Sequence, residues 1–71
     1  VQGRYLEAIA DCEEVIRLNP IHFGALHGVG LCYMALGNFR SAIRAFHSAL
    51  EVQPYSVENQ RLLLECTAKL N

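Results

Sequence analysis

The strongest constraint on this chain is an internal repeat with a period of 34 residues. One glycine, one proline and one cysteine recur at that spacing: Gly3 and Gly37, Pro20 and Pro54, Cys32 and Cys66. At the same spacing of 34 residues, similar apolar or aromatic side chains occupy equivalent positions: Tyr5 and Phe39, Ala8 and Ala42, Ile9 and Ile43, Ile16 and Leu50, Leu18 and Val52. A fixed period of this length is typical of repeat proteins, in which each unit buries its apolar face by stacking on its neighbour.

Within one period, the apolar residues predict two helices joined by a tight turn. They recur at steps of three and four from 23 to 36 and again from 39 to 52. Gly37 is suited to end the first helix in the left-handed conformation, and Asn38 can cap the free amides of the second. Pro54 stops the second helix because it cannot continue the amide ladder. The hairpin is expected to set small side chains beside large ones, Gly30 and Ala42 beside Tyr33 and Phe46.

Residues 23 to 54 resemble one whole tetratricopeptide repeat. The residues that carry the resemblance stand at the spacing of that family: Leu26, Val29, Gly30, Tyr33, Gly37, Phe39, Ala42, Phe46, Ala49 and Pro54. Residues 3 to 20 resemble the second helix of a preceding repeat, with Cys12 and Val15 in place of its usual aromatic residue and alanine. Residues 57 to 70 resemble a following first helix, in which Gln60, Leu64 and Thr67 depart from the pattern. The resemblance implies an all-α fold of antiparallel helix-turn-helix repeats, stacked as a short right-handed α-solenoid.

We therefore expect one repeat domain that is a fragment of a longer chain. Residues 1–20 form the second helix of a partial repeat, residues 21–54 the complete repeat, and residues 55–71 the first helix of a following repeat or a C-terminal capping helix. Repeats contact only their neighbours, so Ile9, Cys12 and Ile16 are expected to lack part of their cover. More chain, or self-association, would fill that gap.

The last helix is expected to keep one face in water, with Ser56 as its N-cap. Its water-facing set is Glu58, Asn59, Gln60, Arg61, Glu65 and Lys69. Leu62, Leu63 and Leu64 would pack inward, although three adjacent leucines span more arc than one stripe. At least one of them should therefore be exposed.

The family resemblance implies a function in protein–protein interaction, because the first helix of each pair lines a concave face that holds a peptide or helix of a partner. The residues expected on that face are Gly24, His27, Leu31 and Met34 from one helix and Glu58, Arg61 and Glu65 from the next. The alternative is that Leu31 and Met34 only pack against adjacent helices. One subclass of the family clamps acidic chaperone tails with lysine, asparagine and arginine. At the corresponding places this chain has Gly28, Glu58 and Leu62, which disfavours such a clamp.

Charge and hydropathy disfavour two classes of partner. Six basic and seven acidic residues give a net charge of −1, and the arginines are scattered singly at 4, 17, 40, 44 and 61. A nucleic-acid interface normally shows a basic stripe or patch, so nucleic acid is disfavoured. No apolar run approaches the ~20 residues of a membrane-spanning helix, so no membrane association is expected.

Chemistry is also disfavoured, and neither an enzyme activity nor a cofactor is expected. Three cysteines without a close pair argue against a disulfide framework and favour a reducing intracellular compartment, the cytoplasm or an organelle interior. The cysteines and the three histidines, His22, His27 and His47, lack the paired spacing of zinc ligands. The leading hypothesis is an interaction scaffold. A structural segment packed within a larger protein or assembly is the alternative, and an RNA-binding helical repeat is less favoured because its relatives run on a period of 35 with basic grooves.

Overall fold

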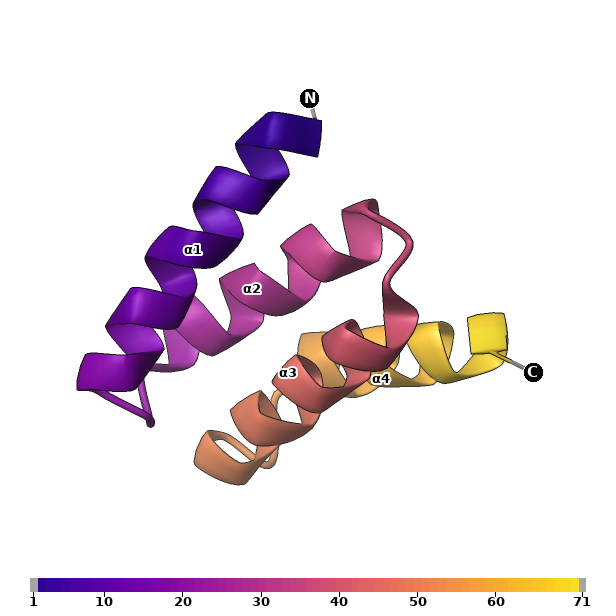
Figure 1. Cartoon of the computed structure of the whole chain (residues 1–71). Helices are drawn as coiled ribbons and strands as arrows, with labels where there is room; N and C mark the ends of the chain where they lie inside the picture. The colour runs from indigo at the N-terminus through magenta and orange to yellow at the C-terminus, as the bar shows by residue number, and fades with distance from the viewer. Residues whose placement is uncertain (1, 71) are drawn as a thin grey trace.

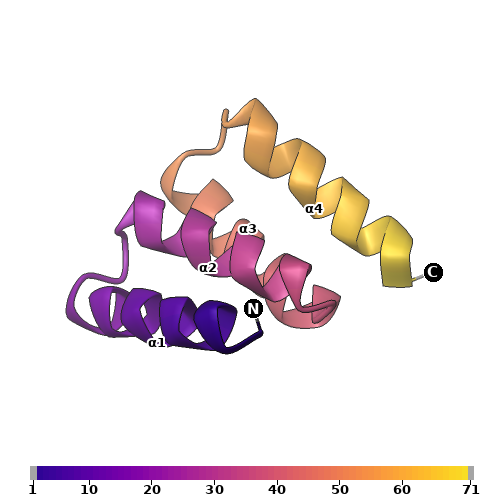
Figure 2. The same cartoon turned by 90° about the horizontal axis from the view of Figure 1, so that it is seen from above.

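The computed structural model describes residues 2–70, and the regular elements in that range are all α-helices (Figure 1). Helix α1 spans Gln2–Leu18, α2 spans Phe23–Ala35, α3 spans Phe39–Val52 and α4 spans Val57–Leu70. Each helix packs against the next one along the chain. Seen from above, α1 and α4 lie at the two ends of the array, with α2 and α3 between them (Figure 2). The expected all-α fold of stacked antiparallel helices is confirmed.

The helix bounds fit within the three predicted segments, 1–20, 21–54 and 55–71. Val1 and Asn71 lie outside the described residues. Which repeat each of these segments represents stays a prediction. Among the described residues, no helix is both long enough and apolar enough to cross a membrane.

The turn between α2 and α3 is built as the sequence predicts. Gly37 has a φ of 78°, the left-handed conformation that L side chains rarely adopt. Its amide donates to the Met34 carbonyl at 3.0 Å, and the Asn38 amide donates to the Tyr33 carbonyl at 2.9 Å. These two bonds form a Schellman motif, which satisfies carbonyls that the end of a helix leaves free. The Asn38 side chain then accepts from the Ser41 amide at 3.3 Å and caps α3.

The closest approach between α2 and α3 is at Gly30, which faces the ring of Phe46. A Cβ added to Gly30 would lie 2.6 Å from the nearest carbon of that ring, closer than real Cβ atoms come. Phe46 is fully buried, and it shares a core cluster with Ala42 of α3 and with Leu62 and Cys66 of α4. The absent side chain of one glycine therefore makes room for the largest side chain of the core.

A second cluster joins the first three helices and corrects one expectation. Ile9 of α1 packs with Val29 of α2 and Ala45 of α3, and only 5% of its surface is exposed. The prediction that Ile9 lacks cover is therefore wrong, because α2 and α3 already supply it. Cys12 and Ile16, which pack against the same cluster, are half-buried.

Helix α4 begins as predicted, but its buried face differs from the expected one. The backbone amide of Asn59 donates to Ser56 Oγ at 3.4 Å, which makes Ser56 the N-cap. Asn59 itself is only 1% exposed, so its place in the water-facing set is wrong. It lies in register with Leu62 and Cys66 on the side turned to the other helices. Of the three adjacent leucines, Leu62 is buried, Leu63 is half-buried and Leu64 is 72% exposed, as the width of the run implies.

The contact between Gly30 and Phe46 predicts opposite effects for two glycine-to-alanine changes on the same helix. Gly30→Ala should lower the free energy of unfolding by about 1–3 kcal/mol, because the new methyl group overpacks a fully buried ring. Gly28→Ala is the matched control, since its Cβ would meet only Cys12 Sγ at an ordinary 3.5 Å. It should raise stability by up to about 1 kcal/mol through helix propensity. Urea unfolding followed by circular dichroism measures both, and equal stability of the two variants would contradict this packing.

Candidate functional site

The candidate partner-binding residues lie on α2 and α4, and we call this set of residues the α2–α4 face. It consists of His27, Leu31 and Met34 from α2 and Glu58, Arg61 and Glu65 from α4. The side chains from α4 are exposed, Leu31 is 40% exposed, and His27 and Met34 are half-buried. Gly24, also expected here, is exposed. The face thus combines a partly exposed apolar side chain with three exposed charged ones.

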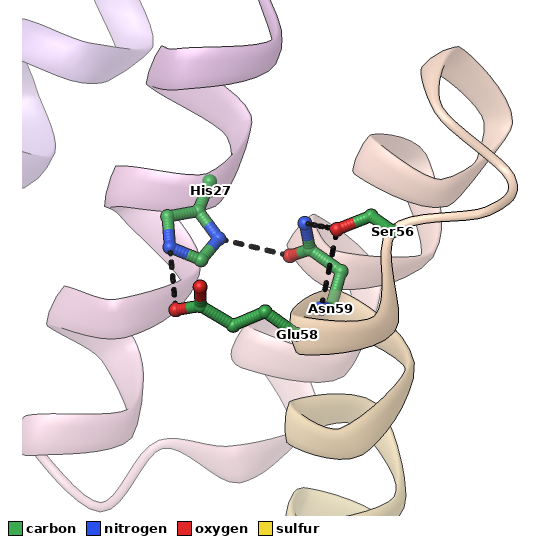
Figure 3. A network of polar contacts seen from close by, with 4 residues as sticks. All are labelled: His27, Ser56, Glu58 and Asn59. Carbon is green, nitrogen blue, oxygen red and sulfur yellow. Dashed lines mark hydrogen bonds and ion pairs between the residues drawn. The ribbon is translucent and has the colours of Figure 1, made fainter.

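A polar network ties α2 to α4 within this face (Figure 3). His27 Nδ1 lies 3.0 Å from Asn59 Oδ1, and His27 Nε2 lies 3.4 Å from Glu58 Oε1. Asn59 Nδ2 donates to Ser56 Oγ at 3.0 Å, so both polar ends of the buried amide are hydrogen-bonded. A buried amide is tolerated only when its groups find partners, so the network fixes how α4 sits against α2.

The same hydrogen bonds assign the protons on His27. Because Asn59 Nδ2 donates to Ser56, its Oδ1 faces the imidazole, and the Nδ1 of His27 must be the donor. A neutral imidazole then presents an unprotonated Nε2 to the Glu58 carboxylate. The ion pair between His27 and Glu58 therefore forms only when the ring carries its second proton.

Two aromatic rings hold the His27 side chain from the apolar side. Phe23 stacks on it at a centroid distance of 6.1 Å and an interplanar angle of 13°. Phe46 lies at 6.1 Å with a tilt of 58°. The core ring that packs on Gly30 thus also lies against the histidine of the α2–α4 face.

Leu31 and Met34 occupy different environments. Met34 packs against the core cluster of Ala42, Phe46, Leu62 and Cys66, as the alternative interpretation of these two residues predicts. Leu31 keeps a substantial exposed surface. On the α2–α4 face, Leu31 is therefore the apolar side chain most accessible to a partner, and Met34 contributes chiefly to the core beneath that face.

Asn59 is the residue of this site that sequence reasoning assigned wrongly. A signal was present, because positions 59, 62 and 66 follow the three- and four-residue steps of a buried helical stripe. A polar residue in that stripe is a candidate for a buried hydrogen bond. The residue type predicts exposure to water and the spacing predicts burial, and for Asn59 the spacing is the correct signal.

The free thiols have the properties of packing residues. Burial, with a smaller contribution from Glu65, raises the pKa of the Cys66 thiol, which is fully buried. Burial, followed by Cys32, Asp11 and Glu13, also raises the pKa of Cys12. Thiolates are therefore disfavoured at both positions. Among residues 2–70, no three histidine, cysteine or acidic side chains are grouped so that they could hold a metal ion together.

Comparison with known proteins places residues 2–66 in a match to the family model described as tetratricopeptide repeat. A TPR repeat-containing protein of Rhizobium etli is 33% identical over 54 residues, which cover 76% of this chain and 26% of that protein. Superkiller complex protein 3 of Homo sapiens is 29% identical over 55 residues, 78% of this chain and 4% of that protein. DnaJ homolog subfamily C member 7 of Homo sapiens is 32% identical over 59 residues, which cover 83% of this chain and 12% of that protein. The chain thus spans about a quarter or less of each of these relatives.

The network predicts unequal effects for its two contacts with His27. His27→Ala should lower the free energy of unfolding by about 1–3 kcal/mol, because it leaves the buried Asn59 carbonyl oxygen without its partner. Glu58→Gln should change it by less than about 1 kcal/mol, because that contact is at the surface. Chemical denaturation of the two variants beside the unaltered chain provides the comparison. A loss for Glu58→Gln as large as that for His27→Ala would contradict the assigned roles.

Burial of Cys66 predicts a protected thiol. In the folded chain at mildly alkaline pH, its reaction with an aromatic disulfide reagent should be at least about tenfold slower than in urea. Because burial disfavours the thiolate, the free energy of unfolding is highest while the Cys66 thiol is neutral. It falls as the pH rises through the raised pKa. Mass spectrometry of peptides labelled over time distinguishes Cys66 from Cys12 and Cys32. Labelling of Cys66 before the two half-buried thiols would refute the core assignment.

Proposed function

Because the chain belongs to the tetratricopeptide repeat family, we propose that it is a protein–protein interaction module whose α2–α4 face holds a peptide or helix of a partner protein. The family as a whole is a non-catalytic scaffold generally involved in protein interactions. The observation that carries the proposal for this chain is Leu31, an apolar side chain of the α2–α4 face that is left 40% exposed.

The composition of the α2–α4 face suits the recognition of a polypeptide. Apolar contact with Leu31 supplies affinity, since burial of apolar surface is favourable and non-directional. The exposed charges of Glu58, Arg61 and Glu65 select a partner and fix its register. An amphipathic helix or an extended peptide with apolar anchors meets both requirements.

The polar network supports the proposal because it holds the face in a fixed shape. Hydrogen bonds from His27 to Asn59 and from Asn59 to Ser56 join α2 to the start of α4. A face that is already ordered loses less conformational entropy when a partner binds. Glu58, which adjoins the network and is itself exposed, is the charge best placed to respond to a ligand.

The kind of partner is narrowed by the residues at the clamp positions. Gly28, Glu58 and Leu62 supply neither the amide donor nor the cations that hold an acidic chaperone tail. Leu62 is in addition buried in the core cluster and is not available to a ligand. We therefore propose that this face takes a partner other than such a tail.

A structural segment within a larger protein is the second candidate, and the exposed apolar residues at the two ends of the array favour it. Leu6 and Leu18 on α1 and Val57 and Leu64 on α4 are largely exposed. Adjacent repeats, or a second copy of the chain, would cover them. The two candidates are compatible, since a repeat array can both stack at its ends and bind on its face.

The interaction proposal predicts that Leu31→Glu weakens peptide binding at least about tenfold, because it places a charge where an apolar anchor docks. Peptides selected from a random displayed library on the unaltered chain are the probe, and fluorescence anisotropy gives their affinity. Leu6→Glu is the matched control, since Leu6 is an exposed leucine on α1, a helix that contributes no residue to the α2–α4 face. Both variants should keep their helical circular dichroism. Equal binding by Leu31→Glu and the unaltered chain would exclude this face as the peptide site.

A further inference from the structure

The other side of α2 borders an open cleft that the α2–α4 face does not use. The cleft lies between α1 and α3, has a volume of about 320 Å³, and includes Ile16, Leu26, Val29 and Ala45 among its apolar lining residues. Its volume is at the lower end of the range of ligand-binding pockets, about 300–1,000 Å³. An apolar side chain of a partner would find apolar neighbours there from all three helices.

The charged side chains that line this cleft differ in whether they are free to bind a ligand. On the α1 side, the Glu13 carboxylate already accepts a hydrogen bond from the Tyr33 hydroxyl at 3.0 Å. Burial and then this bond raise the pKa of Tyr33, which keeps the hydroxyl a donor. On the α3 side stands Arg44, which is exposed. The cleft therefore carries an acid on one wall and a base on the other, and of the two only Arg44 lacks a polar partner among the described residues.

A second hollow adjoins the same stretch of α3. It has a volume of about 490 Å³ and is lined by Arg40, Ile43 and Arg44 of α3 together with Leu70 of α4. Arg44 and Ser41 border both hollows, so the two lie on either side of one turn of α3. We call Arg40, Arg44 and these two hollows the α3 face.

Arg40 and Arg44 are a pair of like charges that form no ion pair with another described residue. They are four residues apart on one helix, a spacing that places their side chains side by side and destabilises the helix by repulsion. The ion pairs of the described residues are those of Arg17 with Glu14 and of His27 with Glu58, and neither involves this pair. Carboxylates brought by a partner would relieve that repulsion.

We propose that the α3 face is a second interaction surface, which binds an acidic peptide segment carrying large apolar side chains. Two carboxylates of the segment pair with Arg40 and Arg44, and its apolar side chains enter the hollows on either side. Arginine is suited to this role because its guanidinium pairs with a carboxylate in a bidentate geometry. Two cations flanked by apolar hollows match an acidic amphipathic peptide better than a nucleic acid, which requires a longer basic stripe.

This surface is separate from the one proposed above. On α2, the cleft uses Leu26, Val29 and Tyr33, whereas the α2–α4 face uses His27, Leu31 and Met34. By helical spacing these two sets point to different sides of α2. The balance of charge also differs, since two acids, Glu58 and Glu65, outnumber the one arginine, Arg61, on the α2–α4 face.

The test uses a fluorescein-labelled synthetic peptide in which aspartates and leucines follow the spacing of an amphipathic helix, and the same peptide with lysine in place of aspartate. We expect the full chain to bind the aspartate peptide, and added salt to weaken binding because charges are screened. Arg40→Glu and Arg44→Glu should each weaken it at least about tenfold. Arg4→Glu on α1, an exposed arginine that belongs to neither proposed surface, is the matched control and should leave the affinity within about twofold.

Several results would overturn the proposal. They are no binding of the aspartate peptide, equal binding of the lysine peptide, or unchanged binding by both arginine variants. Loss of binding in Leu31→Glu with normal binding in Arg44→Glu would place the acidic peptide on the α2–α4 face. Tighter, arginine-dependent binding of a labelled single-stranded RNA would assign the surface to nucleic acid. Arg44→Gln, which removes the charge without adding an acid, replaces Arg44→Glu in the comparison if circular dichroism shows that the latter is unfolded.

Discussion

The packing of the Phe46 ring on Gly30 is the contact on which the rest of the molecule depends. The ring occupies the space of the missing glycine side chain, and this sets the distance between α2 and α3. The same ring packs with Leu62 and Cys66 of α4 and lies against the His27 imidazole. One side chain thus reaches the helix before it, the helix after it and the histidine of the α2–α4 face. A change in the separation of α2 and α3 would consequently displace both proposed surfaces.

Apolar packing alone would not fix how α4 lies on its neighbours, because hydrophobic contact is non-directional. Asn59 supplies the missing direction. Its buried amide is hydrogen-bonded only when His27 of α2 stands opposite Oδ1 and Ser56 stands beside Nδ2. A slide of α4 by one residue would bury the amide without partners, at an unfavourable free energy of about 1–3 kcal/mol. The network therefore contributes specificity of position, and the apolar cluster contributes most of the stability.

Local signals in the sequence correctly predict the turns and the main packing contact. Predictions of burial fail where the burial of a side chain depends on more distant parts of the chain. Gly37, Asn38 and Pro54 act through the backbone of their own neighbours, so residue type and position suffice to predict them. The predictions for Ile9 and Asn59 are wrong because the burial of each side chain depends on helices far along the chain. A count of single arginines also does not indicate that Arg40 and Arg44 lie side by side, because it ignores their four-residue spacing on one helix.

The two proposed surfaces differ in the sign of their charge, and this difference makes each surface selective for a different partner segment. The α2–α4 face carries two acids, Glu58 and Glu65, against Arg61, whereas the α3 face carries Arg40 and Arg44 against Glu13, and the net charge of the whole chain is only −1. A nearly neutral molecule with charge separated in this way attracts a partner segment to one surface and repels it from the other. Such repulsion from the wrong surface is as effective in discrimination as attraction to the right one. Because α2 and α3 are held rigidly by the packing of Phe46 on Gly30, two segments of opposite charge could be held at once in a fixed relative orientation.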